Sequence, residues 1–244
     1  MLENIRPYYE HAGITIYHGD CRDVLRGFTS ESADTVITDP PYLVSYRGRW
    51  GSEWGIIEGD TEASWLSSAF LEVWRVLNSD ALCLSFYGWP HADTFLGAWK
   101  LIGFRPVSQV VCIKDSIGLG HYSRAQHESA YLLAKGSPKK IGPAISDVFD
   151  WEREPVQVHP NQKPLSTMTR LVRAYTAEGC CVLDPFMGSG STLIAAKKLG
   201  LRAVGIEIEE RYCEIAAQRL AQELFDFGPT PEMPTQLELA PEPR

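Results

Sequence analysis

The sequence lacks a long apolar segment, a closely spaced pair of cysteines and an excess of positive charge. Its longest apolar run, Ala81 to Tyr87, is far shorter than the ~18 residues that cross a bilayer. The amino terminus lacks the basic-then-apolar pattern of a signal peptide. The six cysteines form no C-x-x-C pair and the six histidines are scattered, so we expect reduced, packed thiols and no metal site. These absences predict a cytoplasmic protein with no membrane partner.

The shortage of basic residues bears on nucleic-acid binding, because neutralising phosphates supplies much of the affinity of a protein for DNA. The formal net charge is -8, but the charges are unevenly distributed. Residues 114–173 hold nine basic and six acidic side chains, whereas residues 221–244 hold one basic and five acidic. A modest basic patch opposite an acidic tail is compatible with DNA, although an ordinary mixed surface explains the charges equally well.

The most informative stretch is T-D-P-P-Y, which closes an apolar run from Ala33 to Thr38. The run predicts a buried strand, and the two prolines end it because they supply no backbone donor for a ladder. Pro40 and Pro41 fix φ, so the Asp39 carboxylate, the Pro40 carbonyl and the Tyr42 ring keep one mutual geometry. Two acceptors beside an aromatic ring suit the exocyclic amino group of a nucleobase. The alternative, an ordinary turn, is disfavoured because the pattern is rare by chance.

A second informative stretch is P-F-M-G-S-G-S-T, which follows an apolar strand, Cys181 to Asp184. A helix, Leu193 to Leu199, and a strand, Ala203 to Ile206, come next, and this order predicts a βαβ nucleotide-binding unit. Glu207, at the tip of the second strand, has the spacing of an acid that hydrogen-bonds ribose hydroxyls.

The glycine turn itself favours an anionic ligand group. Gly188 and Gly190 permit close backbone approach, and free amides at the helix start attract negative charge. Leu193 stands where a dinucleotide fingerprint has its third small residue, which argues against a pyrophosphate cofactor.

Periodicity predicts the remaining elements of one α/β domain over residues 1–227, followed by a disordered, acidic, proline-rich tail over residues 228–244. The expected strands are Ile14–Tyr17, Ala81–Tyr87, Val107–Ile113 and Ser129–Ala134, and the expected helices are Arg22–Arg26, Thr61–Leu77 with Thr61 as N-cap, Ala92–Ile102, Leu165–Tyr175 and Glu209–Leu224.

Two irregular regions, around 43–60 and 114–158, are predicted to read the substrate. The first is rich in glycine and aromatic residues, and it is placed to close over a base or to contact phosphates through Arg47 and Arg49. Further candidate DNA contacts in the second region are Lys114, Arg124, Lys139 and Lys140.

Together, D-P-P-Y, H-P-N-Q-K-P and D-P-F-M-G-S-G-S-T resemble the motifs of amino-group DNA methyltransferases that use S-adenosylmethionine. The resemblance runs from about Ile14 to Leu220, and the motif order is similar to the circularly permuted β class, in which the catalytic strand precedes the cofactor turn. It implies an α/β fold with a Rossmann-like seven-stranded sheet and helices on both faces. In that sheet, Cys181–Asp184 and Ala203–Ile206 would be strands one and two, with the amino-terminal strands continuing from three onward.

The resemblance also implies roles for individual residues and double-stranded DNA as the partner. Direct methyl transfer to N6 of a flipped adenine is implied, because the D-P-P-Y form mostly marks adenine enzymes and S-P-P-Y marks cytosine N4 enzymes. The implied catalytic residues are Asp39, Pro40, Pro41 and Tyr42. The implied cofactor residues are Asp184, Phe186, Met187, Gly188, Ser189, Gly190, Ser191 and Thr192, with Lys163 near the methionine end, Glu207 on the ribose and Asp20 near the adenine ring. Cys21 and Ile208 are also implied to bind the cofactor.

Several alternatives remain open from the sequence. The same enzyme acting on cytosine N4 is the nearest, and a catalytically silent DNA-binding module of this fold is another. Protein-glutamine methyltransferases carry N-P-P-Y after their glycine turn, and a nicotinamide oxidoreductase would need a third glycine. The short span between Ala134 and His159 leaves little room for a target-recognition domain, so we expect short or relaxed specificity, or help from a second subunit in a homodimer.

Overall fold

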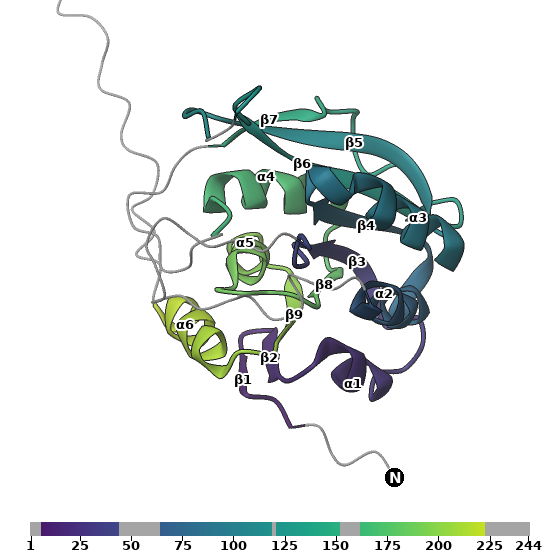
Figure 1. The fold of residues 1–244 in the computed structure, drawn as a ribbon. Helices are drawn as coiled ribbons and strands as arrows, with labels where there is room; N and C mark the ends of the chain where they lie inside the picture. Colours follow the sequence, from purple (N-terminus) through teal and green to yellow (C-terminus); the bar gives the residue numbers. More distant parts are fainter. Residues whose placement is uncertain (1–5, 44–63, 119–120, 152–161, 223–244) are drawn as a thin grey trace, which may run out of the picture.

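The computed structural model describes residues 6–43, 64–118, 121–151 and 162–222 (Figure 1). Several sequence predictions lie outside these residues: Arg47 and Arg49, the 43–60 loop beyond Leu43, Thr61 as an N-cap, and the tail over 228–244.

The strands of the described residues form one mixed sheet in the order β1-β2-β9-β8-β3-β4-β6-β5-β7. Strands β2, β9, β8, β3 and β4 run parallel, β6 is antiparallel to both β4 and β5, and β7 pairs parallel with β5. Their bounds are β1 Tyr9–His11, β2 Ile14–His18, β3 Ala33–Thr38, β4 Leu77–Tyr87, β5 Arg105–Lys114, β6 His127–Lys135, β7 Val148–Trp151, β8 Cys181–Asp184 and β9 Arg202–Glu207.

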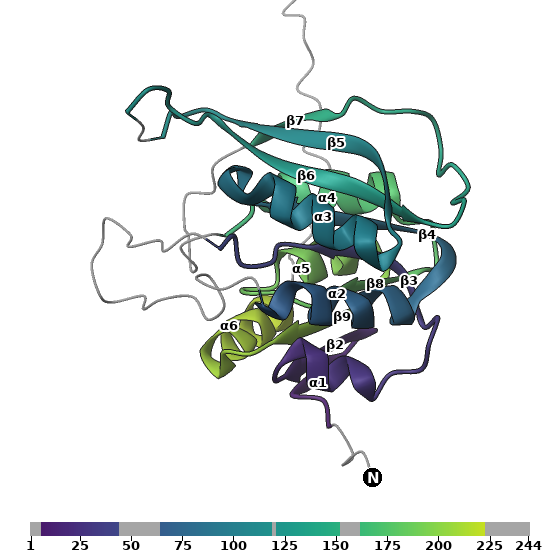
Figure 2. The same ribbon diagram turned by 45° about the vertical axis from the view of Figure 1, so that its right-hand side comes forward.

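Helices cover both faces of this sheet (Figures 1 and 2). Their bounds are α1 Cys21–Arg26, α2 Ser64–Val76, α3 Ala92–Ile102, α4 Leu165–Tyr175, α5 Ser191–Lys198 and α6 Glu210–Ala221, with a short 3-10 turn, η2, over Trp89–His91. One apolar cluster lies between the sheet and α4, α5 and α6, and a second lies between the sheet and α1, α2 and α3. Alternate residues of one strand serve the two clusters, as Leu84 and Cys83 of β4 do.

The structure confirms the expected α/β fold with helices on both faces. It also places β8 and β9 beside each other and parallel, as the predicted βαβ unit implies, and it adds that β2 lies next to β9 and β3 next to β8. The sheet has nine strands rather than seven, because β1 and β7 extend its two edges. We expected the stretch around Val148–Trp151 to be irregular. A strand of four residues shows too little alternation to be recognised before its partner β5 is known.

Strand direction gathers the two informative motifs at one edge of the sheet. Asp39 follows β3, Glu207 ends β9, and the glycine turn follows β8, so all three lie at the carboxyl ends of parallel strands. From β8 the chain continues to β9 on one side, and from β3 it continues to β4 on the other side. Ligands of open α/β sheets bind where the strand order reverses in this way. Because β6 is antiparallel to β4, its first residues reach the same edge. We call this the catalytic edge, after the predicted catalytic residues that follow β3.

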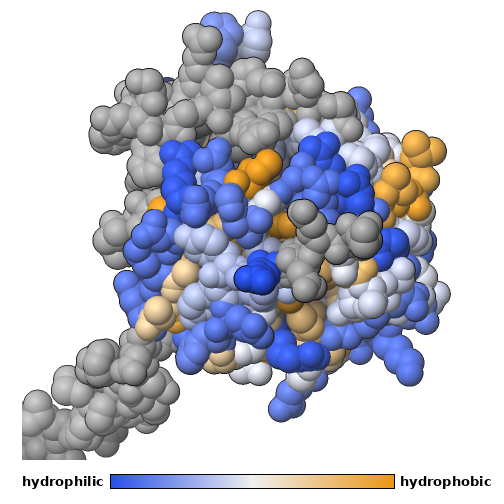
Figure 3. Space-filling model, turned by 90° about the horizontal axis from the view of Figure 1, so that it is seen from below, coloured by the Kyte–Doolittle hydropathy of each residue, from blue (hydrophilic) through white to orange (hydrophobic). Residues whose placement is uncertain are grey.

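No helix of the described residues is both long and apolar enough to cross a bilayer. The face seen from below the view of Figure 1 is largely hydrophilic, with small hydrophobic areas separated from one another (Figure 3).

Replacing Gly190 by alanine is expected to lower the free energy of unfolding by about 1–3 kcal/mol. Gly190 has a φ of +82°, and a Cβ there would lie 2.9 Å from Cβ of Ala216 on α6. Gly97 on α3 is the control, because a Cβ there meets nothing within 4 Å, and Gly97→Ala should stabilise by roughly 0.5–1 kcal/mol. Urea unfolding of both variants measures the difference, and an unaffected Gly190→Ala protein would contradict the packing of the turn on α6.

Candidate active site

The catalytic edge joins Asp39 to the glycine turn through a hydrogen bond between neighbouring strands. The hydroxyl of Thr38, the last residue of β3, donates to Oδ1 of Asp184, the last residue of β8, over 2.7 Å. Both side chains are buried. Because Asp39 directly follows Thr38, the two stretches singled out in the sequence share one site.

The Asp39 carboxylate has one oxygen engaged and one free. Oδ2 lies 2.5 Å from Nζ of Lys163, whereas Oδ1 is buried without a hydrogen-bond partner among the described residues. Burial raises the pKa of Asp39, the positive charge of Lys163 lowers it, and the negative charge of Glu128 raises it again, with a net upward shift. A buried acceptor without a donor is uncommon in a native protein, and it marks where a donor from a ligand would bind.

The Tyr42 side chain is held at both its ring and its hydroxyl. The hydroxyl donates to Oε2 of Glu128 over 3.2 Å and accepts from Nζ of Lys163 over 3.1 Å. Behind it, Gly88 follows β4, and a Cβ at Gly88 would lie 2.8 Å from both Cβ and the carbonyl oxygen of Tyr42. Only glycine at that position lets Tyr42 approach the end of β4 so closely. Sequence reasoning missed Gly88, whose only signal is its place immediately after a strand.

Glu128 is the other residue that sequence reasoning missed. It is the second residue of β6, which we expected to begin at Ser129. Its signal in the sequence is a single acid at the start of an apolar strand, and that gives no indication of its partners. Lys163 lies against Asp39, Glu128 and Tyr42. Its proposed place at the methionine end of the cofactor stays a prediction.

The glycine turn is anchored by Glu207 and by β9. The Gly188 amide donates to Oε2 of Glu207 over 2.9 Å, and the Glu209 amide donates to Oε1 over 2.8 Å. The Met187 amide donates to the Ile206 carbonyl over 3.0 Å. Burial raises the pKa of Glu207, and the two amides oppose that rise. The carboxylate therefore fixes the turn and retains lone pairs for a further donor.

Most of the other residues of the turn are packed or hydrogen-bonded, and one hydroxyl is left without a partner among the described residues. The ring of Phe186 packs on Trp65 and Phe70. The Ser189 carbonyl accepts from Arg219 on α6 over 2.6 Å. Met187 and Thr192 are buried, and Oγ of Ser191 is buried with no partner in the described part of the chain. An unpartnered hydroxyl at the start of α5, beside positive-φ glycines, fits a polar ligand group at this point.

Asp20, Cys21 and Ile208 lie next to this turn, after the ends of β2 and β9. The Gly19 amide donates to the Glu207 carbonyl over 2.9 Å, which places Asp20 beside Glu207. Asp20 caps α1 and forms an ion pair with Arg22, whose hydrogen bonds lower the pKa of that carboxyl. Cys21 is buried, which raises the pKa of its thiol to about 12, and Ile208 is exposed.

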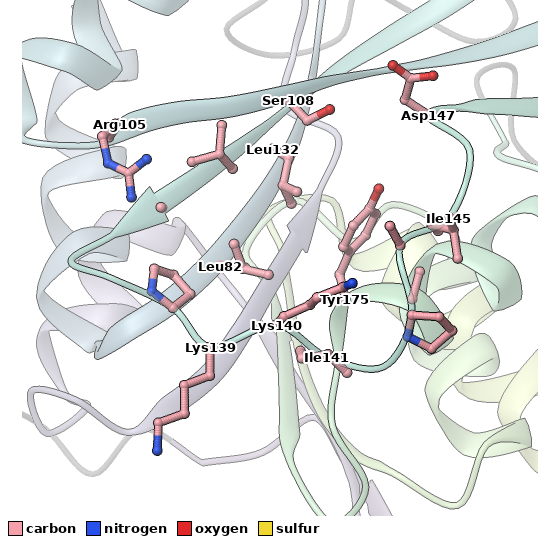
Figure 4. Close-up of a pocket in the computed structure, with 16 residues that line it drawn as sticks. Leu82, Arg105, Ser108, Leu132, Lys139, Lys140, Ile141, Ile145, Asp147 and Tyr175 are labelled. Carbon is pink, nitrogen blue, oxygen red and sulfur yellow. The ribbon is translucent and has the colours of Figure 1, made fainter.

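The candidate DNA contacts of the described residues separate into two groups. Lys114 ends β5 and Arg124 lies in the β5–β6 connection, which projects beyond the sheet at the catalytic edge (Figure 2). Lys114 is engaged there, with Nζ 2.5 Å from Oε1 of Glu128. Lys139 and Lys140 instead line a separate cavity with Arg105 and Tyr175, near the start of β5 and the end of β6 (Figure 4). This cavity is at the opposite end of the strands from Asp39, and a DNA role for these two lysines stays a prediction.

The side chains of the described residues hold no group of three or more His, Cys, Asp or Glu that could bind a metal ion. All six cysteines have free thiols.

The buried carboxyl of Asp184 gives a test that does not depend on activity. Burial raises its pKa to about 7 from 3.8, although hydrogen bonds from Thr192, Thr38 and the Phe186 amide oppose the rise. The folded protein therefore holds this proton more tightly than the unfolded chain, so its stability falls as pH rises from about 4 to about 7. We expect the stability of Asp184→Asn relative to wild type to increase across that window and to be constant above it. Urea unfolding at several pH values measures this, and a pH-independent difference would contradict the assignment.

The mixed sheet, the glycine turn after β8 and the acid at the tip of β9 define the class of Rossmann-like methyltransferases that use S-adenosylmethionine. Residues 33–218 match the family N6_N4_Mtase, described as DNA methylase, and the chain belongs to that family. S-adenosylmethionine is the cofactor. The residues of the turn fit it, because Oγ of Ser191 is buried without a partner among the described residues and the Glu207 carboxylate, which holds the turn, retains lone pairs for a further donor.

Two relatives illustrate the sequence likeness. YubD of Escherichia coli (strain K12), named as a methylase, is 42% identical over 203 residues, covering 83% of this chain and 88% of YubD. The E. coli protein named DNA adenine methyltransferase YhdJ is 28% identical over 251 residues, covering 84% of this chain and 82% of YhdJ.

Two solved structures illustrate the structural likeness. TTHA0409 of Thermus thermophilus, titled a DNA modification methylase and complexed with S-adenosyl-L-methionine, is 26% identical with a TM-score of 0.66, covering 87% of this chain and 96% of that one. The cytosine-N4-specific PvuII DNA methyltransferase is 17% identical with a TM-score of 0.75, covering 91% of each chain, and it supports the fold alone.

Proposed function

We propose that this DNA methyltransferase belongs to the permuted β class and transfers the methyl group of S-adenosylmethionine to N6 of adenine in double-stranded DNA. The observation that carries the proposal is Oδ1 of Asp39, which has no partner among the described residues, is buried next to the fixed Tyr42 and is joined through Thr38 to the glycine turn. An amino group that brings two donors and a flat face would satisfy that oxygen and the ring together.

The bound cofactor supplies an electrophilic methyl group on a sulfonium. The amino nitrogen of adenine is a weak nucleophile, because the ring shares its lone pair. Asp39 and the Pro40 carbonyl accept the two N–H groups, which favours a pyramidal nitrogen and offsets the positive charge that develops on it. The nitrogen gains a methyl group and loses one hydrogen as a proton, which Asp39 is placed to accept. The rest of the catalysis is alignment.

A base in a duplex must leave the stack to reach Asp39, at a cost of a few kcal/mol. Stacking on Tyr42 recovers roughly 1–3 kcal/mol of that cost. Further contacts must supply the balance. We assign them to the two irregular regions of a single domain over 1–227, with Arg124 and the exposed Tyr122 of the β5–β6 connection as the described candidates.

Two observations favour adenine over cytosine. The first is the acid at position 39, since D-P-P-Y mostly marks adenine enzymes. The second is the similarity to YhdJ, whose name states an adenine activity. Cytosine N4 is the second candidate, because a cytosine-N4-specific enzyme has the same fold.

Mass spectrometry of nucleosides distinguishes the two bases. The purified chain is incubated with labelled S-adenosylmethionine and unmethylated duplex DNA of mixed sequence, and the DNA is then digested. We expect label in N6-methyl-2′-deoxyadenosine. Label in N4-methylcytosine would move the proposal to the second candidate, and methylation of protein alone would overturn both.

A further inference from the structure

The residues around Asp39 form a partly buried, electrically balanced cluster, centred on the buried Lys163, that the proposed chemistry does not by itself require. It comprises Asp39, Tyr42, Lys114, Glu128 and Lys163, contributed by four segments distant in the sequence. Two carboxylates face two ammonium groups, so the cluster has no net charge when all four are ionised. Buried charges are costly unless paired, so an arrangement this complete needs an explanation.

Lys163 has no free donor in this cluster. Its ammonium lies 2.5 Å from Oδ2 of Asp39, 2.8 Å from Oε2 of Glu128 and 3.1 Å from the Tyr42 hydroxyl, which uses all three of its N–H groups. Its side chain is only 7% exposed, and Nζ lies between 4.8 and 5.5 Å from the ring centres of Phe86, Tyr42 and Trp151. Lys163 is therefore fixed in position, and it determines which oxygen of Asp39 stays free.

Glu128 holds this lysine. Its Oε2 contacts Lys163 and the Tyr42 hydroxyl, and its Oε1 contacts Lys114 over 2.5 Å. Burial would raise the pKa of Glu128, but Lys163 and Lys114 outweigh it and lower the pKa to about 2, so this carboxylate stays ionised. Among the described members of the cluster, Glu128 alone contacts all three of Lys163, Lys114 and the Tyr42 hydroxyl.

The charge of Glu128 matters for the reaction itself. Lys163 beside Asp39 orients the carboxylate, yet its positive charge also opposes positive charge on an amino nitrogen bound at Oδ1. A second carboxylate on the far side of Lys163 cancels that effect. Without it the cluster would carry a net positive charge at the point where the transition state also becomes positive.

We propose that Glu128 is a positioning residue for methyl transfer. It holds Lys163 so that Oδ1 of Asp39 stays free, and its negative charge offsets the positive charge of Lys163. Through the Tyr42 hydroxyl it also fixes the ring on which the base stacks. This inference rests on the proposed function of Asp39. It assigns Glu128 no contact with the base or the cofactor.

Opposite shifts in the titration of Asp39 are the signature of this arrangement. The negative charge of Glu128 raises the pKa of Asp39 and the positive charge of Lys163 lowers it. Glu128→Gln should therefore move the Asp39 titration to lower pH, and Lys163→Met should move it to higher pH. Among the described residues, the other ionisable groups that face Asp39 are Tyr42 and Asp184, and both are unchanged in these variants.

The experiment follows Asp39 by carbon NMR of the labelled carboxyl group and, in parallel, the acidic limb of the pH profile of kcat. We expect the carboxyl titration and the acidic limb of kcat to move to lower pH in Glu128→Gln and to higher pH in Lys163→Met. In Glu128→Gln, kcat should fall on the order of tenfold to a hundredfold and KM for DNA should change much less. Cofactor affinity, measured by calorimetry, should be unchanged. Glu128→Asp, which keeps the charge, should restore the wild-type acidic limb.

Glu72→Gln is the matched control, since Glu72 is a half-buried acid paired with Arg75 on α2. It should leave both the titration and kcat unchanged. The inference would be overturned if the Asp39 titration moved in the same direction in Glu128→Gln and Lys163→Met, or did not move. It would also be overturned if Glu72→Gln lost as much kcat as Glu128→Gln. If Lys163→Met does not fold, the direction in Glu128→Gln decides alone. The NMR titration needs no turnover, so it tests the cluster even if wild type methylates cytosine or shows no activity.

Discussion

Asp39→Ala is expected to lower the rate of methyl transfer by on the order of 10²–10³-fold or more, with little change in affinity for S-adenosylmethionine. The variant removes the carboxylate whose Oδ1 is free at the catalytic edge, and it leaves the glycine turn and Glu207 in place. Single-turnover methylation of duplex DNA measures the rate, and calorimetry measures cofactor binding.

Folding must be controlled in this experiment, because Asp39→Ala leaves Lys163 with Glu128 as its only carboxylate partner among the described residues. Asp39→Asn keeps the shape of the side chain and serves as the second variant. We expect it also to be strongly impaired, since an amide is a weaker acceptor than a carboxylate. A folded Asp39→Ala protein that methylates within tenfold of wild type would remove Asp39 from its role.

Glu207→Ala is expected to weaken cofactor binding by about tenfold to a hundredfold, the equivalent of roughly 1–3 kcal/mol for an unpaired buried donor. The variant leaves the Gly188 amide without its acceptor, and it removes the oxygens proposed to bind the ribose hydroxyls. Isothermal titration with S-adenosylmethionine measures the affinity directly.

The matched control for Glu207 is Glu209→Ala. Glu209 is an acid two residues away with a side chain 40% exposed and paired with Arg211, so its loss should not change the affinity. Melting temperatures of the two variants without cofactor separate a general loss of stability from a loss of ligand contacts. Unchanged affinity in a folded Glu207→Ala protein would show that the ribose assignment is wrong.

Local patterns were sufficient to predict the fold class and the two chemical stretches. The apolar run before Asp39 and the glycine turn after Asp184 each lie within about a dozen consecutive residues, and the physics that shapes them is local. The pairing of β8 with β9, which the predicted βαβ unit implies, is confirmed by the strand order. The roles of the individual residues stay predictions.

The partners of Asp39 could not be predicted in the same way. Lys163 and Glu128 are respectively 124 and 89 positions away from Asp39 in the sequence. Glu128 reaches the site because β6 is antiparallel to β4, and Lys163 reaches it from the segment that enters α4. No periodicity encodes either placement. Gly88 was missed for a similar reason, since its contact with Tyr42 depends on how two strand ends meet. The short edge strands β1 and β7 are likewise visible only through their pairing.

The most direct test of the account is long-read mapping of modified bases in DNA from cells that express the wild-type chain or Asp39→Ala. We predict N6-methyladenine at a defined sequence context in DNA from cells that express wild type, and none above background in DNA from cells that express Asp39→Ala. N4-methylcytosine with wild type, or the same N6-methyladenine with both proteins, would contradict it.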